Sequence, residues 1–222
     1  MEELPKKLIL KKAKTHKGRL AISQKLGKLV EDPKINLLIN TNNSSEIMRL
    51  VLNDLYLMFK EFSKKLMKKN KIESVFTTKK DIEYLLEKNN AAIFVYTSDT
   101  KKKGMNIVFG NSFNFKVMDS FEFEMLNFIN IDHFSQFIKV DSSIKPIIIF
   151  QGEVFETDKE YERIKNFFLD LFKLRNINDI DIKGLNRIIA VSCGEDKIIK
   201  IRCFEVDKIS EYIVYYFFYL SS

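Results

Sequence analysis

This 222-residue chain has two cysteines, a residue type that can form a disulfide or bind a metal. Cys193 and Cys203 flank a hairpin turn predicted around Glu195, and their distances from the turn do not place them opposite one another. The sequence has no second cysteine pair, and neither histidine is near enough to complete a zinc site. We therefore expect two buried or half-buried free thiols and no metal centre.

Histidines and paired carboxylates are the remaining candidates for catalysis. His16 lies in a basic segment and His133 follows an aspartate, and neither has a Ser, Cys or carboxylate at a catalytic spacing. The acidic pairs that could hold a divalent ion on one strand face, as in an RNA-processing enzyme, are Asp179 with Asp181 and Glu122 with Glu124. An exposed strand face explains this alternation more simply. Because phosphate-loop and nucleophile motifs are also missing, we expect no enzyme, no catalytic residue and no cofactor.

The positive charge of the chain is concentrated at its N-terminus. The formal net charge is +7 at pH 7. Residues 1–30 carry nine basic side chains against Glu2 and Glu3, whereas basic and acidic residues balance in the rest of the chain. Such an arm favours a polyanion, with nucleic acid the first candidate and an acidic membrane surface the second. The alternative is a solvated tail that only aids solubility.

Three features could bring phosphates to the protein. They are the arm, a basic hairpin tip at 101–103, and a strand–turn–helix at 40–45 that would present backbone N–H groups and a helix N-terminus. The residues expected at these contacts are Lys6, Lys7, Lys11, Lys12, Lys14, Lys17, Arg19, Ser44, Ser45, Lys101, Lys102 and Lys103. The aromatic residues fall mostly at core spacings, so no base-stacking platform is expected. These features favour sequence-independent contact with RNA.

The first half of the chain predicts a strand, two helices and a hairpin. A buried strand is expected at 35–39. Ser44 or Ser45 can cap a long helix that reaches residue 62, and lysines from 60 to 71 are placed on its C-terminal half. The residues expected on its buried face are Ile47, Val51, Leu55, Met58 and Phe62. A shorter helix over 77–86 and a hairpin over 91–109 follow, and residues 113–137 are ambiguous between strand and helix.

The second half repeats this order. Ile147–Phe150 reads as a strand covered on both faces because it is apolar throughout. A helix over 158–172 and a hairpin over 187–204 come next. The last apolar run, 212–220, is too short for a membrane-spanning helix, which needs roughly 20 residues. We expect it either to pack on the body or to form a partner interface, and we expect neither a secretory signal nor a membrane partner.

These patterns predict an α/β (α+β) protein of two similar lobes, each with a sheet and packed helices. The expected divisions are an arm at 1–30, a domain at 31–206 with lobes of about 31–140 and 141–206, and an apolar C-terminal segment at 207–222.

Several short motifs resemble the Brix-domain proteins of ribosome assembly. Residues 150–155 read FQGEVF, 161–166 read YERIKN, 182–185 read IKGL and 197–202 read KIIKIR, and 106–110, NIVFG, falls upstream in the family's order. The similarity extends over about residues 20–206. Asn40-Thr41 and Asn111 stand where the family usually has Arg-Gly and Arg. Arg202 ends the motif at 197–202, and the resemblance adds it to the residues expected to contact RNA.

The resemblance implies a duplicated anticodon-binding-type fold and a nucleolar factor for large-subunit assembly. It further implies that the protein acts in the nucleus and binds 5S rRNA and large-subunit precursor rRNA. A regulator-of-ribosome-synthesis-type protein and the 5S-associated ribosomal proteins are the implied protein partners, through which the 5S ribonucleoprotein is recruited. The alternatives are another Brix-family pre-rRNA-binding factor and a scaffold that binds only proteins.

Overall fold

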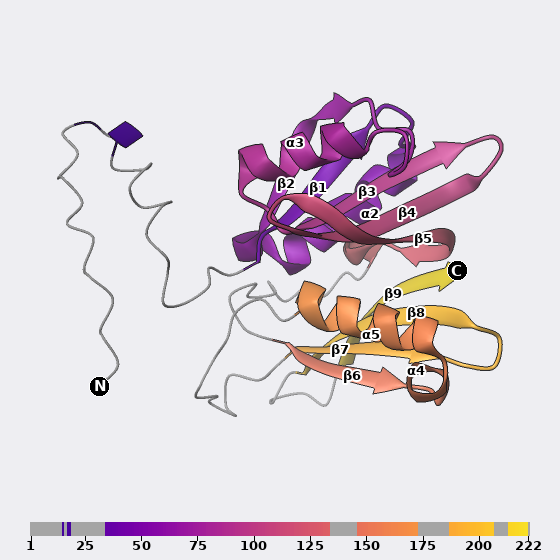
Figure 1. The fold of residues 1–222 in the computed structure, drawn as a ribbon. Helices are drawn as coiled ribbons and strands as arrows, with labels where there is room; N and C mark the ends of the chain where they lie inside the picture. Colours follow the sequence, from indigo (N-terminus) through magenta and orange to yellow (C-terminus); the bar gives the residue numbers. More distant parts are fainter. Residues whose placement is uncertain are drawn as a thin grey trace, which may run out of the picture. The chain divides into compact units, whose positions relative to one another are not determined.

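The computed structural model describes residues 15, 17, 18, 34–133, 146–172, 187–206 and 213–221. The chain divides into two compact units, residues 1–32 and 33–222, and the second contains all the elements discussed below (Figure 1). In the described ranges, no helix combines the length and apolar character needed to cross a membrane.

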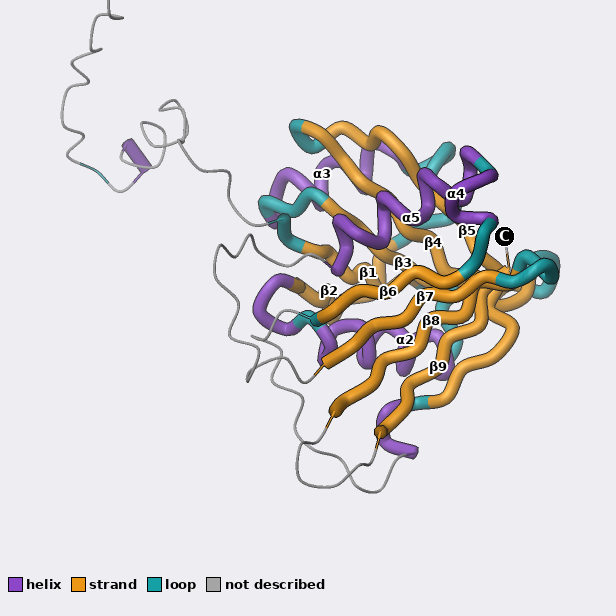
Figure 2. Tube along the Cα trace, turned by 90° about the horizontal axis from the view of Figure 1, so that it is seen from below, coloured by secondary structure: helices purple, strands orange, loops and turns teal. Residues whose placement is uncertain are grey.

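A nine-stranded sheet forms the frame of the second unit, in the order β2-β1-β3-β4-β5-β9-β8-β7-β6 (Figures 1 and 2). Its strands are β1 (Asn36–Thr41), β2 (Ser63–Asn70), β3 (Ile93–Thr100), β4 (Gly104–Phe113), β5 (Lys116–Ile129), β6 (Ile147–Gln151), β7 (Arg187–Cys193), β8 (Ile198–Val206) and β9 (Ile213–Ser221). Its helices are α2 (Glu46–Met58), η1 (Lys60–Phe62), α3 (Lys79–Asn89), η2 (Ile131–His133), α4 (Val154–Thr157) and α5 (Lys159–Phe172). The predicted α/β class is confirmed.

The strand order runs symmetrically outward from the β5–β9 pair. In the first half β1 and β3 are parallel, and β4 and β5 then follow antiparallel. In the second half β6 and β7 are parallel, and β8 and β9 follow antiparallel. Antiparallel pairing of β5 with β9 joins the halves into one sheet, so neither half keeps an open inner edge. The C-terminal apolar run therefore packs within the body as β9, between β5 and β8, and a duplication of the two halves stays a prediction.

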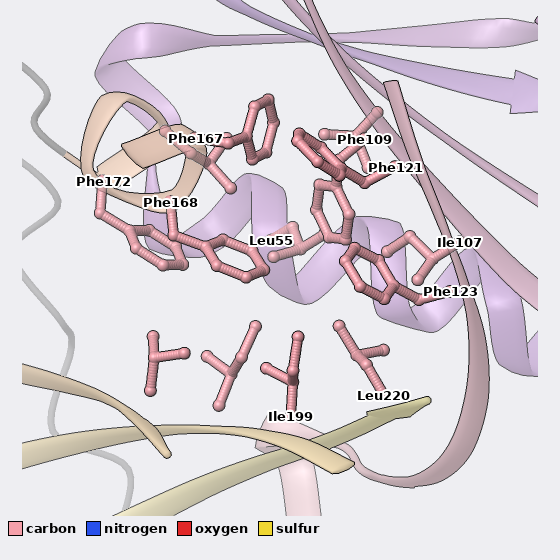
Figure 3. Close-up of a cluster of buried hydrophobic side chains, with 14 of the residues drawn as sticks. Leu55, Ile107, Phe109, Phe121, Phe123, Phe167, Phe168, Phe172, Ile199 and Leu220 are labelled. Atoms are coloured by element: carbon pink, nitrogen blue, oxygen red, sulfur yellow. The ribbon is translucent and has the colours of Figure 1, made fainter. Parts of the chain in front are cut away.

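Two helices and both halves of the sheet share one large core. Helices α2 and α5 pack with strand residues of the first half and with β7, β8 and Leu220 of the second. The rings of Phe109 and Phe123 lie 5.7 and 6.4 Å from that of Phe168 on α5 (Figure 3). Helix α3 covers the opposite face of the first half, over Leu37 and Phe94. The two halves of the chain thus bury their apolar faces against each other as well as against helices.

The two halves also exchange hydrogen bonds at the ends of their long helices. Arg187, at the start of β7, is 1% exposed and donates through Nη1 to the carbonyl oxygen of Met58 at 2.8 Å. Asn36, at the start of β1, donates through Nδ2 to the carbonyl oxygen of Leu171 on α5 at 3.5 Å. The last carbonyl groups of a helix have no partner within it. Each half therefore supplies a donor to the helix end of the other.

The long helix predicted for residues 45–62 ends early. Helix α2 stops at Met58, and the lysine-rich residues that follow form the edge strand β2, which pairs in parallel with β1. Hydrogen bonding to β1 outweighs the helical propensity of the lysines, and lysine is a residue that protects open sheet edges. Val51, Leu55 and Met58 of the predicted face are buried, whereas Ile47 is 49% exposed. The expected assignment of these lysines to a helix was wrong.

The expectation that strand 147–150 is covered on both faces was also wrong. Strand β6 is the other edge of the sheet, and Ile147 and Ile149 are 38% and 39% exposed. A continuous apolar run does not distinguish a central strand from an edge strand. The ambiguous segment 113–137 is largely the long strand β5, whose alternate residues Phe121 and Phe123 enter the core.

Cys193 and Cys203 are both buried thiols, as predicted. They lie opposite Ile199 and Ile189, so they are not cross-strand partners. Burial raises the pKa of the Cys193 thiol and keeps it protonated at neutral pH.

Replacing Cys193 and Cys203 together with alanine is therefore expected to lower stability by about 1–3 kcal/mol through lost packing. Bound zinc and RNA affinity should not change. Urea unfolding, metal analysis and RNA titration of the purified double variant measure the three quantities. Stoichiometric zinc in the parent chain that disappears in the variant would overturn the thiol assignment.

Candidate nucleic-acid interface

Three segments that are far apart in sequence meet at one end of the sheet. Strands β2 and β3 both run parallel to β1, so the carboxyl ends of all three lie at the same edge. The turn 42–45 follows β1, Lys68 to Lys71 end β2, and the tip 101–103 follows β3. We call these three segments the carboxyl edge. In open α/β sheets, ligands bind outside the carboxyl ends of strands.

Backbone hydrogen bonds fix the carboxyl edge. The N–H of Asn42 donates to the carbonyl oxygen of Asn70 at 3.0 Å, and the N–H of Asp99 donates to that of Asn43 at 2.6 Å. The side chain of Asn70 adds a bond to the carbonyl oxygen of Asn40 at 3.3 Å. The turn after β1 is thus held to both neighbouring strands, and the groups at this edge keep a constant spacing.

Lysines dominate the side chains of the carboxyl edge. Exposed cations come from β2 and from the hairpin tip: Lys68, Lys69, Lys71, Lys101, Lys102 and Lys103. Lys103 is paired with Glu122 on β5, with 2.8 Å between Nζ and Oε1. Glu46, Asp99 and Glu73 are the nearest carboxylates along these segments. The balance is positive, which favours contact with phosphates.

The lysines of β2 were missed as site residues because sequence reasoning placed them on a helix. The sequence feature that could have indicated them is their grouping on a short segment between an apolar helix and a loop. A strand at a sheet edge places exposed lysines beside the turn that follows its neighbour, whereas a helix continuing to residue 62 and beyond would spread them around its axis.

The structure separates the two serines predicted at this edge. Ser44 is 8% exposed, and its Oγ lies 2.9 Å from Oγ1 of Thr97 within the fold. Ser45 precedes α2 as its N-cap, accepts the backbone N–H of Arg49 through its carbonyl oxygen at 3.1 Å, and makes no side-chain capping bond. What this turn can present to an anion is therefore its backbone and the helix N-terminus.

Of the other predicted residues, the structure describes Arg202 and Lys17. Arg202 is half-buried on β8, beyond the β5–β9 pair in the strand order, and is not brought to the carboxyl edge. Lys17 is exposed in the first unit. The arm residues that lie outside the described residues are Lys6, Lys7, Lys11, Lys12, Lys14 and Arg19.

Of the candidate catalytic groups, the structure describes Glu122, Glu124 and His133. Glu122 and Glu124 are both exposed on β5 while the phenylalanines between and beside them are buried. His133 is exposed at the end of η2, and Asp179, Asp181 and His16 lie outside the described residues. Among the side chains that are described, no group of three His, Cys, Asp or Glu residues could hold a metal ion.

The protein is an α/β protein with a mixed sheet, helices on both faces of the first half of that sheet, and lysines at its carboxyl edge. The chain belongs to the Brix-domain family, because the model of that domain matches residues 41–213. The curated relatives to which it is similar include ribosome production factor 2 homologues.

Curated relatives support this placement, and a solved structure shares the fold. The "Ribosome production factor 2 homolog" of Schizosaccharomyces pombe is 35% identical over 184 residues, which are 83% of this chain and 57% of the relative. The homologue of the same name from Homo sapiens is 27% identical over 84% of this chain and 60% of its own length. The chain thus spans about three fifths of these relatives. A "probable ribosomal biogenesis protein" from Aeropyrum pernix K1 shares the fold, with a TM-score of 0.55 at 9% identity over 86% of this chain and 97% of that one.

Proposed function

We propose that this chain is a non-enzymatic assembly factor of the large ribosomal subunit that binds rRNA. The names of its curated relatives, ribosome production factor 2 homologues, support a place in ribosome biogenesis. The observation that carries the RNA contact is the carboxyl edge, where lysines of β2 and of the hairpin tip flank the backbone of the turn 42–45. Backbone phosphates supply much of the affinity of such surfaces and carry no sequence information.

We further infer the finer role that the family resemblance implies. The protein would act in the nucleus and nucleolus, with a regulator-of-ribosome-synthesis-type protein, to bring 5S rRNA and its associated ribosomal proteins to the precursor particle. Purification from cells separates this role from its alternatives. Recovery of 5S rRNA with its ribosomal proteins supports it, recovery of other pre-rRNA regions without 5S rRNA indicates another Brix-type role, and salt-insensitive association without RNA indicates a protein-only scaffold.

The RNA contact is tested through its salt dependence. Replacing Lys68, Lys69 and Lys71 with serine should lower the slope of log affinity against log salt by up to about 2–3, taking 0.7–0.9 for each phosphate contact. A control variant with the same charge change replaces Lys88, Lys159 and Lys197, which are exposed away from the carboxyl edge. Binding of the full-length chain to RNA is measured by fluorescence anisotropy at salt concentrations from about 50 to about 300 mM. Equal slopes for the two variants would remove the carboxyl edge from the site.

The N-terminal arm is tested in the same titration. Serine at Lys6, Lys7, Lys11, Lys12, Lys14 and Lys17 should lower the slope by up to about 5 if each meets a phosphate. An unchanged slope and affinity would show that the arm is a solvated tail and that the contacts are made by the body alone.

A further inference from the structure

One aromatic side chain stands in solvent beside the lysines of the carboxyl edge. Phe76, in the loop 71–78 that leads from β2 to α3, is 91% exposed, the highest value among the large hydrophobic side chains described. Its neighbours Val75 and Ile72 are 9% and 2% exposed and pack in the core beneath α3. A loop that buries two of its apolar residues and leaves the largest in water needs an explanation, because burying a phenylalanine gains about 1.5–3 kcal/mol.

The loop is built so that Phe76 stays outside. The hydroxyl groups of Ser74 and Thr77 lie 2.9 Å apart, and the N–H of Thr77 donates to Oγ of Ser74 at 3.2 Å. The hydroxyl of Thr78 donates to the carbonyl oxygen of Ser74 at 2.7 Å. These bonds fix the backbone on both sides of Phe76, so presenting the ring to a ligand costs little conformational entropy.

The surroundings of the ring are cationic and polar. Five lysines against one carboxylate, that of Glu73, lie between residues 68 and 80: Lys68, Lys69, Lys71, Lys79 and Lys80. All five are exposed. Along the chain, the exposed polar residues nearest to Phe76 on either side are Glu73 and Thr77. An exposed ring among cations is the combination with which proteins hold single-stranded nucleic acid.

We propose that Phe76 stacks on an unpaired base of RNA while the lysines of 68–80 hold the neighbouring phosphates. This inference rests on the RNA contact proposed above and adds the class of ligand, a single-stranded segment such as a loop or bulge. Stacking requires a base whose face is open, which a base-paired duplex does not offer along its length. Stacking does not distinguish strongly among bases, so the site would tolerate different sequences.

The chain contains no tryptophan, which allows a direct spectroscopic test. Phe76→Trp introduces a single indole at the proposed stacking position, and Phe113→Trp provides a matched control. Phe113 is 76% exposed, but it is the last residue of β4, and the hairpin tip precedes the first residue of that strand. With a ten-nucleotide oligoadenylate, the emission of Phe76→Trp should be quenched and that of Phe113→Trp should not. A blunt RNA duplex should quench neither.

Affinity supplies the second readout. Phe76→Ala should weaken binding of the oligoadenylate by between about fivefold and about a hundredfold, the effect of losing one stacked base, and change duplex binding less than about twofold. Phe113→Ala should change neither. Equal oligoadenylate binding by Phe76→Ala and the parent chain would overturn the stacking inference, as would quenching of Phe76→Trp by a protein partner in place of RNA.

The lysine variants distinguish failure of this inference from failure of the proposed RNA contact. If the triple serine variant at Lys68, Lys69 and Lys71 loses affinity while Phe76→Ala does not, the edge binds RNA without stacking. If neither variant changes binding, the proposed RNA site itself is wrong.

Discussion

Alanine in place of Gly152 is expected to destabilise the protein by about 3–5 kcal/mol, through backbone strain and a steric clash. Gly152 follows β6 with φ +132°, a conformation that residues with a side chain rarely adopt. A Cβ at this position would lie 2.0 Å from the carbonyl oxygen of Cys193, at the end of the adjacent strand β7. The backbone of residue 152 fixes the position of the Cβ, and the carbonyl group of Cys193 is itself backbone. Neither can therefore move without disturbing the β6–β7 pair. Urea unfolding followed by circular dichroism measures the loss.

Gly194→Ala is the matched control for this prediction. Its Cβ would meet Oδ1 of Asp196 at 3.2 Å, and a side-chain carboxylate can rotate away. The control should therefore change stability by less than about 1 kcal/mol. If both variants unfold at the same urea concentration, the close approach of Gly152 to β7 does not constrain the fold.

Replacing Arg187 with methionine is expected to lower stability by about 2–4 kcal/mol. The change keeps most of the side-chain volume but removes the donor to the carbonyl oxygen of Met58, which is left buried near the end of α2. A hydrogen bond from a charged donor contributes about 1.5–3 kcal/mol, and imperfect packing of the new side chain adds to the loss. The same unfolding experiment measures it, and hydrogen exchange should show faster opening at the end of α2.

The control is Arg163→Met. Arg163 pairs with Asp119 at 2.6 Å, but its side chain is 60% exposed, and exposed ion pairs contribute about 0–1 kcal/mol. A loss at Arg163 as large as that at Arg187 would contradict the view that the buried guanidinium holds the two halves together.

Local patterns in the sequence were sufficient for several elements. The tip 101–103 and the turn after Cys193 were predicted from a basic or glycine-containing segment between β-prone runs, and both are hairpin turns in the structure. Helix α3 begins next to the predicted Thr77-Thr78 start, because capping and turn chemistry depend on residues close in sequence. The basic arm and the family motifs were equally visible, since charge and residue identity need no fold.

The tertiary structure decided what the lysines after α2 do. Residues 63–70 are rich in helix-forming Lys, Leu and Met, yet they form β2 because β1 offers an open row of backbone partners. Pairing in parallel with β1 then carries Lys68 and Lys69 to the same end of the sheet as the turn 42–45 and the hairpin tip. That juxtaposition depends on strand order, which no local pattern specifies.

The sequence by itself determined the α/β class, the family, the charge of the arm and the two buried thiols. Only the tertiary structure showed that β5 and β9 join the halves into one sheet, that β6 is an edge, and that Phe76 lies in solvent. Apolar residues predict burial on average, but whether a particular one is covered depends on contacts between segments distant in the chain. Phe76 and Phe168 are the same residue type, and they differ because α5 faces the shared core whereas the loop 71–78 is tied down with its aromatic ring outward.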